Sequence, residues 1–381
     1  MTKLYNCFSL VSVLFVALAI FNASITHAKE DIPQWVKTIE AKGDLRLRYQ
    51  LTEKDETGKT TPDRSRGRIR ARLGISGKVT DDAQVFIGLA SGGGDPRSTN
   101  QTLQDTFSTK AINLDYAYAK IKLTKQITFL GGKIVRKSII WEPSDLLWDS
   151  DVNVEGGGLV LRTGPVFLKA GGFILDESKE DLTATPPKTH TADPLMYVVQ
   201  PGVKIDSGNL HVKAAVTYYG FSSVQGRSLE HSAGSNTMTG GALRYDYDAI
   251  SPALEIGLKN AAGEAVPYAA LFAEYVKNAD PSDENIGLLI GFKAGARKVV
   301  KAGQWQFKYL YRKLEKDAWL DTFPDSDFAG GKTGYKGHEV VVQVGLKKNV
   351  ALGLDYYMTE ELNSTTDKEE KILQVDLALK F

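Results

Sequence analysis

Apolar and polar residues alternate strictly along many short segments of the chain. In the carboxyl-terminal segment 372–381 the apolar residues fall on one parity: Leu373, Val375, Leu377, Leu379 and Phe381. Successive side chains of a β-strand point to opposite faces, so this segment has one apolar and one polar face. The same alternation recurs at 39–51, 210–218, 304–312, 340–346 and 350–356. The pattern predicts an all-β chain built from amphipathic strands.

Short and long connections alternate between these segments. The short links fall near 80–82, 124–126, 163–165, 206–209, 260–265, 298–303 and 347–349. The long polar segments are 52–66, 92–110, 136–157, 176–195, 221–238, 278–285, 315–337 and 360–370. Transmembrane β-barrels place short turns on the periplasmic side and long loops outside. The connections therefore predict a transmembrane antiparallel β-barrel of sixteen strands with both termini periplasmic.

Two alternatives stay open at this point. A soluble antiparallel sheet with one wet face would show the same alternation. Residues 239–258 fit either two short strands split around Ser251-Pro252 or one long, kinked strand. We interpret this span as one strand and keep eighteen strands as the alternative.

The amino terminus has the pattern of a secretory signal. Lys3 is followed by an almost unbroken apolar run over 8–21 and by the small residue Ala28 ahead of charged residues. The run is shorter than the about 20 residues that a spanning helix needs. We expect residues 1–28 to be a signal peptide and residues 29–381 to form a single barrel domain. The one cysteine, Cys7, lies in the signal, so the mature chain would have neither disulfides nor thiolate chemistry.

Composition narrows the class of protein. The chain has 47 Lys and Arg against 46 Asp and Glu, and this net charge of +1 argues against a nucleic-acid partner. No apolar run beyond the signal reaches spanning length, which excludes a helical membrane protein. A closed sheet pairs every backbone polar group in hydrocarbon, although each strand is only half apolar. A barrel of about sixteen strands is too wide for side chains to fill, so an aqueous channel remains.

Arginines occupy every second position from Arg64 to Arg72, and the opposite parity from Ile69 to Ile75 is apolar. Lipid cannot be the arginine face, because an Arg at the bilayer midplane costs about 2–4 kcal/mol. This face must therefore line the lumen, next to two arginines of the preceding strand. We predict these pore-lining basic residues: Arg46, Arg48, Arg66, Arg68, Arg70 and Arg72.

The third long loop, 136–157, combines carboxylates with large apolar residues. Trp141 and Trp148, with the pairs at 139–140 and 146–147, have no reason to stay in solvent. Inward folding against the barrel wall would bury them and carry the carboxylates into the lumen. We predict these acidic residues of a constriction loop: Glu142, Asp145, Asp149, Asp151 and Glu155. Metal binding by these carboxylates is a weaker alternative, and neither a metal nor a cofactor is expected.

Several motifs resemble known outer-membrane proteins. A last strand that ends in Phe381 resembles the closing strand and assembly signal of bacterial outer-membrane β-barrels, and the acidic loop opposite arginines resembles the constriction of general diffusion porins. A family of bacterial putative porins is similar over essentially the entire mature chain. The motifs that carry this resemblance are the Arg-x-Arg-x-Arg strand, Gly132-Lys133, 146–151, Glu155-Gly156, 273–278 and the terminal Phe381.

The resemblance implies a passive pore in the bacterial outer membrane. Its expected partners are outer-membrane lipids and lipopolysaccharide, the barrel assembly machinery, small hydrophilic solutes and, in a homotrimer, two further copies of the chain. The resemblance does not identify a permeant solute.

The favoured function is thus a porin that passes small hydrophilic solutes and ions. A substrate-selective channel for anionic solutes or polysaccharide export is an alternative, since an arginine ladder suits anions. A plugged structural or adhesive barrel is a third. An enzyme is not expected, because the chain has no Gly-x-Ser-x-Gly, phosphate-binding loop or dinucleotide fingerprint. The four histidines of the expected mature chain show no metal-ligand spacing: His190, His211, His231 and His338.

Overall fold

The computed structural model describes residues 35–58, 62–177, 192–366 and 368–381. The expected signal peptide, 1–28, lies outside these residues. In the described part of the chain the helical elements are three single 3₁₀ turns, at Val36–Thr38, Arg136–Ser138 and Ala329–Gly331. Within the described ranges, a helix with the length and hydropathy needed to cross a bilayer is not found.

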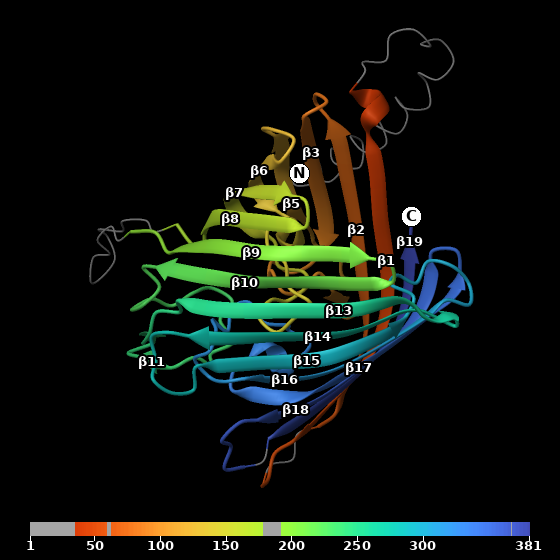
Figure 1. Ribbon diagram of the computed structural model, residues 1–381. Coiled ribbons are helices and arrows are strands. Elements are labelled where there is room, and N and C mark those ends of the chain that lie inside the picture. The colour runs from red at the N-terminus through yellow and green to blue at the C-terminus, as the bar shows by residue number, and fades with distance from the viewer. Residues whose placement is uncertain (1–34, 59–61, 178–191, 367) are drawn as a thin grey trace, which may run out of the picture.

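Sixteen antiparallel strands close into one barrel (Figure 1). Each strand pairs with the next, and β19 pairs with β1 from Asp44 opposite Lys380 to Asp55 opposite Glu369, which closes the ring. The strands are β1 Glu40–Asp55, β2 Arg64–Lys78, β3 Ala83–Ser91, β5 Ile112–Lys122, β6 Ile127–Ile134, β7 Val154–Thr163, β8 Val166–Ile174, β9 Leu195–Ser207, β10 Leu210–Ser222, β13 Ala249–Glu264, β14 Val266–Asn278, β15 Ile286–Gly295, β16 Trp305–Leu314, β17 Tyr335–Lys347, β18 Val350–Glu361 and β19 Glu369–Lys380. The predicted sixteen-stranded barrel is confirmed.

Three short pieces lie outside the ring. β4 (Gln101–Thr102) belongs to the connection between β3 and β5 and pairs with β2, while β11 (Met238–Thr239) and β12 (Ala242–Leu243) form a separate two-stranded sheet. The prediction of one kinked strand over 239–258 is therefore wrong in its first half, and the alternative of eighteen strands is also wrong. Pro252 itself lies within β13, opposite Val216 of β10.

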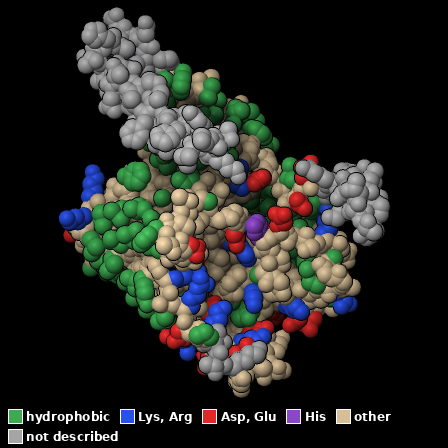
Figure 2. Space-filling view, turned by 180° about the vertical axis from the view of Figure 1, so that it is seen from behind, with side chains coloured by type: hydrophobic (Ala, Val, Ile, Leu, Met, Phe, Trp, Pro, Cys, Tyr) green, Lys and Arg blue, Asp and Glu red, His purple; other side chains and the backbone are tan. Residues whose placement is uncertain are grey.

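The two faces of the barrel wall differ in polarity as the period of two requires. On the outer face large apolar side chains are exposed, for example Leu47 and Ile75. On the inner face polar residues of the same strands are buried, for example Arg48 and Gln374. Charged side chains of both signs gather in the middle of the face that Figure 2 shows, and hydrophobic side chains cover its left flank.

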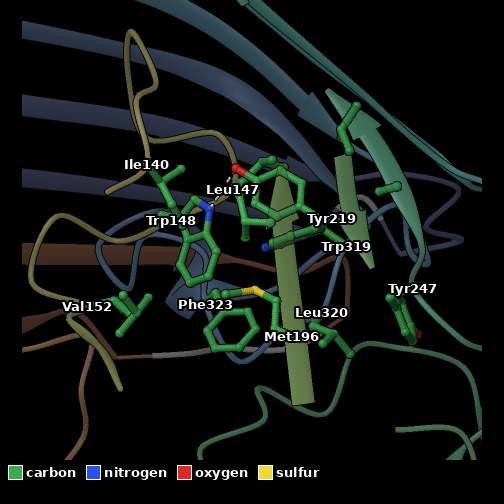
Figure 3. Close-up of a cluster of buried hydrophobic side chains, with 14 of the residues drawn as sticks. Ile140, Leu147, Trp148, Val152, Met196, Tyr219, Tyr247, Trp319, Leu320 and Phe323 are labelled. Atoms are coloured by element: carbon green, nitrogen blue, oxygen red, sulfur yellow. Dashed lines mark hydrogen bonds between the residues drawn. The ribbon is translucent and has the colours of Figure 1, made fainter. Parts of the chain in front are cut away.

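Two long connections fold into the barrel and build a hydrophobic core there. We call residues 135–153 loop 3 and residues 315–334 loop 7. Trp148 of loop 3 lies 5.6 Å from Trp319 and 4.7 Å from Phe323 of loop 7 between ring centroids, and 6.2 Å from Tyr219 of β10 (Figure 3). Fully buried aliphatic residues surround this aromatic group: Ile139, Ile140, Leu146, Leu147 and Leu320. The apolar residues of loop 3 fold inward as predicted, because burial removes their large surface from water.

Candidate functional site in the barrel interior

A charged cavity of about 360 Å³ lies between the two inward-folded loops and the wall of β1, β2 and β15–β18. Its basic lining residues are Arg46, Arg48, Arg70, Arg97, Arg136, Lys137, Lys293 and Lys308. Its acidic lining residues are Glu142, Asp145, Asp149, Asp151, Asp325, Asp327, Glu339 and Asp355. The cavity thus brings together three of the six arginines and four of the five carboxylates that the sequence predicted for the pore.

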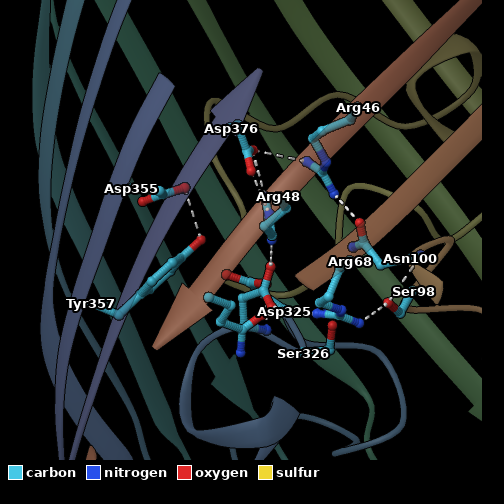
Figure 4. A network of polar contacts seen from close by, with 12 residues as sticks. Arg46, Arg48, Arg68, Ser98, Asn100, Asp325, Ser326, Asp355, Tyr357 and Asp376 are labelled. Atoms are coloured by element: carbon cyan, nitrogen blue, oxygen red, sulfur yellow. Dashed lines mark hydrogen bonds and ion pairs between the residues drawn. The ribbon is translucent and has the colours of Figure 1, made fainter. Parts of the chain in front are cut away.

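Arg48 in this cavity donates three hydrogen bonds to carboxylates. It donates from Nε and Nη2 to both carboxylate oxygens of Asp376, at 2.7 and 2.8 Å, and from Nη1 to Asp327 at 2.9 Å (Figure 4). Its side chain is 4% exposed. A two-pronged contact between Arg and a carboxylate fixes both geometry and charge, so Arg48 ties loop 7 to β1 and β19.

Three more of the predicted pore-lining arginines, Arg46, Arg70 and Arg72, have carboxylate or amide partners as well. Asp44 of β1 accepts from both Arg70 and Arg72, each at 2.8 Å, and Arg72 also lies 3.4 Å from Asp151 of loop 3. Arg46 donates to the side-chain oxygen of Asn100 at 2.7 Å.

Arg68 bonds to two neutral side chains, and its third polar neighbour is an acid of loop 7. It donates to Gln50 at 3.0 Å and to Ser98 at 3.2 Å, and it lies 3.8 Å from Asp327. Arg66 precedes it on the same face of β2 and is half-buried. Among the described residues, Asp151 is the one carboxylate of loop 3 within ion-pair distance of the arginines of β1 and β2. Most of the counter-charge of these arginines therefore comes from Asp44, Asp327 and Asp376.

Two further loop 3 carboxylates, Glu142 and Asp145, bond to residues of the same loop. Glu142 forms a buried ion pair with Arg136. Asp145 accepts from Ser144 at 2.7 Å; burial opposes its ionisation, but Lys308 and Arg312 more than compensate and lower its pKa to about 2.

Asp149 is buried at the junction of the two loops. Its carboxylate accepts from the backbone N–H groups of Ser326 at 2.8 Å and Asp151 at 2.9 Å. Burial, and secondarily the charge of Asp151, raises the pKa of Asp149 to about 7.

Glu155 is not brought to this cavity. It lies in β7 on the same parity as the outward-facing Leu159, its side chain is 61% exposed, and it pairs with Lys133 of β6 at 2.6 Å. The loop ends at residue 153, earlier than the expected 157, and strand parity then turns Glu155 away from the interior.

Sequence reasoning missed the acids of loop 7. Asp325 accepts from Arg312 at 3.4 Å, but burial raises its pKa well above the usual range. Asp327 is also opposed by burial, yet Arg48 and Arg68 keep its pKa low. The sequence did contain a signal for them. Loop 3 was selected because it holds large apolar residues, and loop 7 holds such residues too, Trp319 and Phe323 among them.

Three carboxylates of this region lie close enough to hold a cation. One oxygen from each of Asp145, Asp325 and Glu339 lies within 4.8 Å of the others. Lysine and arginine side chains already provide counter-charge, since Lys308 lies 2.6 Å from Glu339 and Arg312 lies 3.4 Å from Asp325. The cluster therefore gives no reason to assign a metal.

Comparison with solved structures shows the fold. Pseudomonas putida OprB has a TM-score of 0.59 at 10% identity, covering 91% of this chain and 95% of that chain. Salmonella typhi OmpF, in a complex with daunomycin, has a TM-score of 0.50 at 12% identity, covering 90% and 97%. A mutant of the Rhodopseudomonas blastica porin also reaches 0.50, at 11% identity and coverage of 90% and 100%.

Comparison of sequences shows the family. None of the curated proteins matches this chain. The family described as "Putative porin" matches residues 50–257 and 243–381, which is most of the chain. The chain therefore belongs to this porin family, and it is a β-barrel diffusion channel of the bacterial outer membrane.

Proposed function

We propose that the charged cavity is the constriction through which small hydrophilic solutes and ions diffuse. The observation that carries this proposal is the arrangement of charge across it. Arginines of β1 and β2 face carboxylates of the two inward-folded loops, with Arg48 2.9 Å from Asp327 of loop 7 and Arg72 3.4 Å from Asp151 of loop 3. Opposite charges on two sides of a narrow passage create a transverse field, which bulk water screens less than at an open surface.

Single-channel recording in a planar bilayer tests the pore itself. A porin gives an ohmic conductance, whereas a plugged structural or adhesive barrel stays silent. The plugged alternative draws some support from the hydrophobic core that loops 3 and 7 build inside the barrel. A silent barrel whose strands are correctly inserted would overturn the diffusion proposal.

Reversal potentials under a salt gradient test the constriction. Replacing Arg68 and Arg70 with Glu is expected to shift selectivity towards cations. Replacing Glu142, Asp145 and Asp149 with their amides is expected to shift it towards anions, and both shifts shrink at high ionic strength. If conductance persists and neither set of substitutions moves the reversal potential, these charges do not line the constriction.

The assembly of the protein is part of the same proposal. We infer that residues 1–28 are removed on export, that residues 29–381 form the barrel domain, and that the barrel assembly machinery recognises the last strand with Phe381. Backbone bonds support a role for Phe381 at the closing seam, because it exchanges two with Gly43, at 2.9 and 3.0 Å. The homotrimer, the contact with lipopolysaccharide and the lack of catalytic activity are further predictions of the family resemblance.

A further inference from the structure

We propose that the interior wall of β7–β10 carries a second site, separate from the constriction, that binds small organic oxyanions. This inference rests on the proposed diffusion function, because the site would select among the solutes that pass. The site is a cavity of about 490 Å³ beside the short turn between β7 and β8, at the periplasmic end of the barrel. Its charged lining residues are Arg162, Lys169, Lys204, Asp206 and Lys213.

The cavity holds four cations and a single carboxylate. One cation comes from each of β7, β8, β9 and β10. The carboxylate, Asp206, is already engaged by Lys259 at 2.8 Å and His211 at 2.9 Å, and Lys204 lies 3.5 Å away. Positive charge therefore exceeds negative charge in this part of the lumen.

Lys169 is the residue that most needs a counter-charge. It is 4% exposed, and the described part of the chain offers its ammonium group neither a hydrogen bond nor an ion pair. Its Nζ lies 5.9 Å from the ring centroid of Phe167, a weak contact for a buried cation. By contrast Lys308, which faces the constriction, pairs with Glu339 at 2.6 Å. An unpaired buried charge is costly, so an anion in the cavity would stabilise Lys169.

Lys213 adds a second positive charge next to the first, and its partner in the register with β13 is Glu255, which Lys293 already pairs at 2.9 Å. In the register with β9, Lys213 lies directly opposite Lys204, and like charges in this position destabilise a sheet. Its Nζ is 5.6 Å from the centroid of Phe167, the ring that Lys169 also approaches. The two ammonium groups thus converge on one ring, and a single oxyanion between them would relieve both.

Loop 3 places an aromatic ring next to one of these lysines. The Trp141 ring centroid lies 4.5 Å from Nζ of Lys213. Gln200 of β9 holds the backbone of Trp141 in place, accepting from its N–H at 2.9 Å and donating to its carbonyl at 2.7 Å. A carboxylate or phosphate group would bind the lysines while an apolar or ring-shaped body contacts Phe167, the aromatic residue of the cavity lining.

Isothermal titration of the folded barrel in detergent micelles measures this binding directly. The probes are sodium benzoate, sodium acetate and sodium phosphate. Benzoate and phosphate are both expected to bind, and acetate more weakly than benzoate if the ring of Phe167 contributes. Lys169→Met and Lys213→Met are each expected to weaken binding about tenfold, because each removes a charge-assisted hydrogen bond.

Lys133→Met is the matched control, since Lys133 lies on the outer side of β6 and pairs with Glu155. It should bind all probes as the unmodified protein does. Absence of binding to the unmodified barrel, or an affinity in both interior lysine variants equal to that of the unmodified barrel, would overturn the site. Conductance of the same preparations in KCl separates this outcome from failure of the diffusion proposal, because a barrel can conduct ions without binding oxyanions.

Discussion

Arg48 and Asp376 are joined by two hydrogen bonds, at 2.7 and 2.8 Å, across the seam where the first and last strands meet. The two residues lie directly opposite each other in the register of β1 and β19. The same guanidinium group also reaches Asp327 of loop 7 at 2.9 Å. Closure of the barrel and placement of a loop in its lumen therefore share one side chain.

Removal of either partner of this pair should change both stability and selectivity. Asp376→Asn leaves excess positive charge and is expected to shift the reversal potential towards anions, and Arg48→Met is expected to shift it towards cations. Arg48→Met should also lower the free energy of unfolding by about 3 kcal/mol, because it removes the closest cation of two carboxylates, Asp376 and Asp327, whose other cations lie at 3.5 and 3.8 Å.

Urea unfolding and reversal potentials, measured on the same preparations, check this prediction. The double variant should lose less stability than the sum of the single variants, because the two residues interact directly. Additive losses would mean that the contact contributes little.

The two acids of loop 7 should behave differently although they are two residues apart. Asp327→Asn is expected to shift selectivity towards anions at neutral pH, since Arg48 and Arg68 keep the pKa of Asp327 low and its side chain ionised. Asp325→Asn is expected to shift selectivity less, because burial raises the pKa of Asp325 and opposes its ionisation. Reversal potentials under a KCl gradient measure both, with the outward-facing Glu155→Gln as the control. An equal shift from the two loop 7 variants would contradict this assignment.

Selectivity should depend on pH near neutrality through Asp149. Burial, together with the charge of Asp151, raises the pKa of Asp149 to about 7, so this carboxyl is neutral below that pH and ionised above it. The pore is expected to prefer anions more at pH 6 than at pH 8, and Asp149→Asn should remove this step. Measurement of the reversal potential across this range shows whether it does.

The same shift has a consequence for stability. Because the folded pKa lies above the ordinary value of 3.8, the folded state binds the proton more tightly than the unfolded state. The contribution of Asp149 to the stability of the docked loops should be complete below about pH 4. It should be lost as the pH rises to about 7. Hydrogen exchange in loop 3 at the two ends of this window measures the change, and Asp149→Asn should show none.

The carboxyl-terminal ring and Gly43 form a packing pair that should matter for assembly. A Cβ at Gly43 would overlap the Phe381 ring and the backbone oxygen of Arg72. Deletion of Phe381 and the substitution Gly43→Ala are each expected to lower the amount of heat-modifiable barrel in outer-membrane fractions. Gly353→Ala is the matched control, because a Cβ there meets its neighbours at 3.6 Å or more. Normal assembly of the Phe381 deletion would argue against the assembly signal.

The sequence alone predicted the strands and their faces. A period of two places Leu47 and Arg48 on opposite sides of β1 whatever the rest of the chain does, and the alternation of short and long connections predicts sixteen strands. The missed hairpin, β11 and β12, shows where this reasoning ends. Residues 238–243 pair with each other outside the ring, and local alternation does not reveal which strand a segment joins.

Only the tertiary structure decided which charges meet. Arg48 contacts acids 279 and 328 positions further along the chain, because the ring brings its first and last strands together. Loop 7 lies beside the arginines because Trp319 and Phe323 pack on Trp148 of loop 3 inside the barrel. Side-chain period is a local property of the backbone, whereas ion pairing across a lumen depends on strand closure and loop packing, which involve residues from the whole chain.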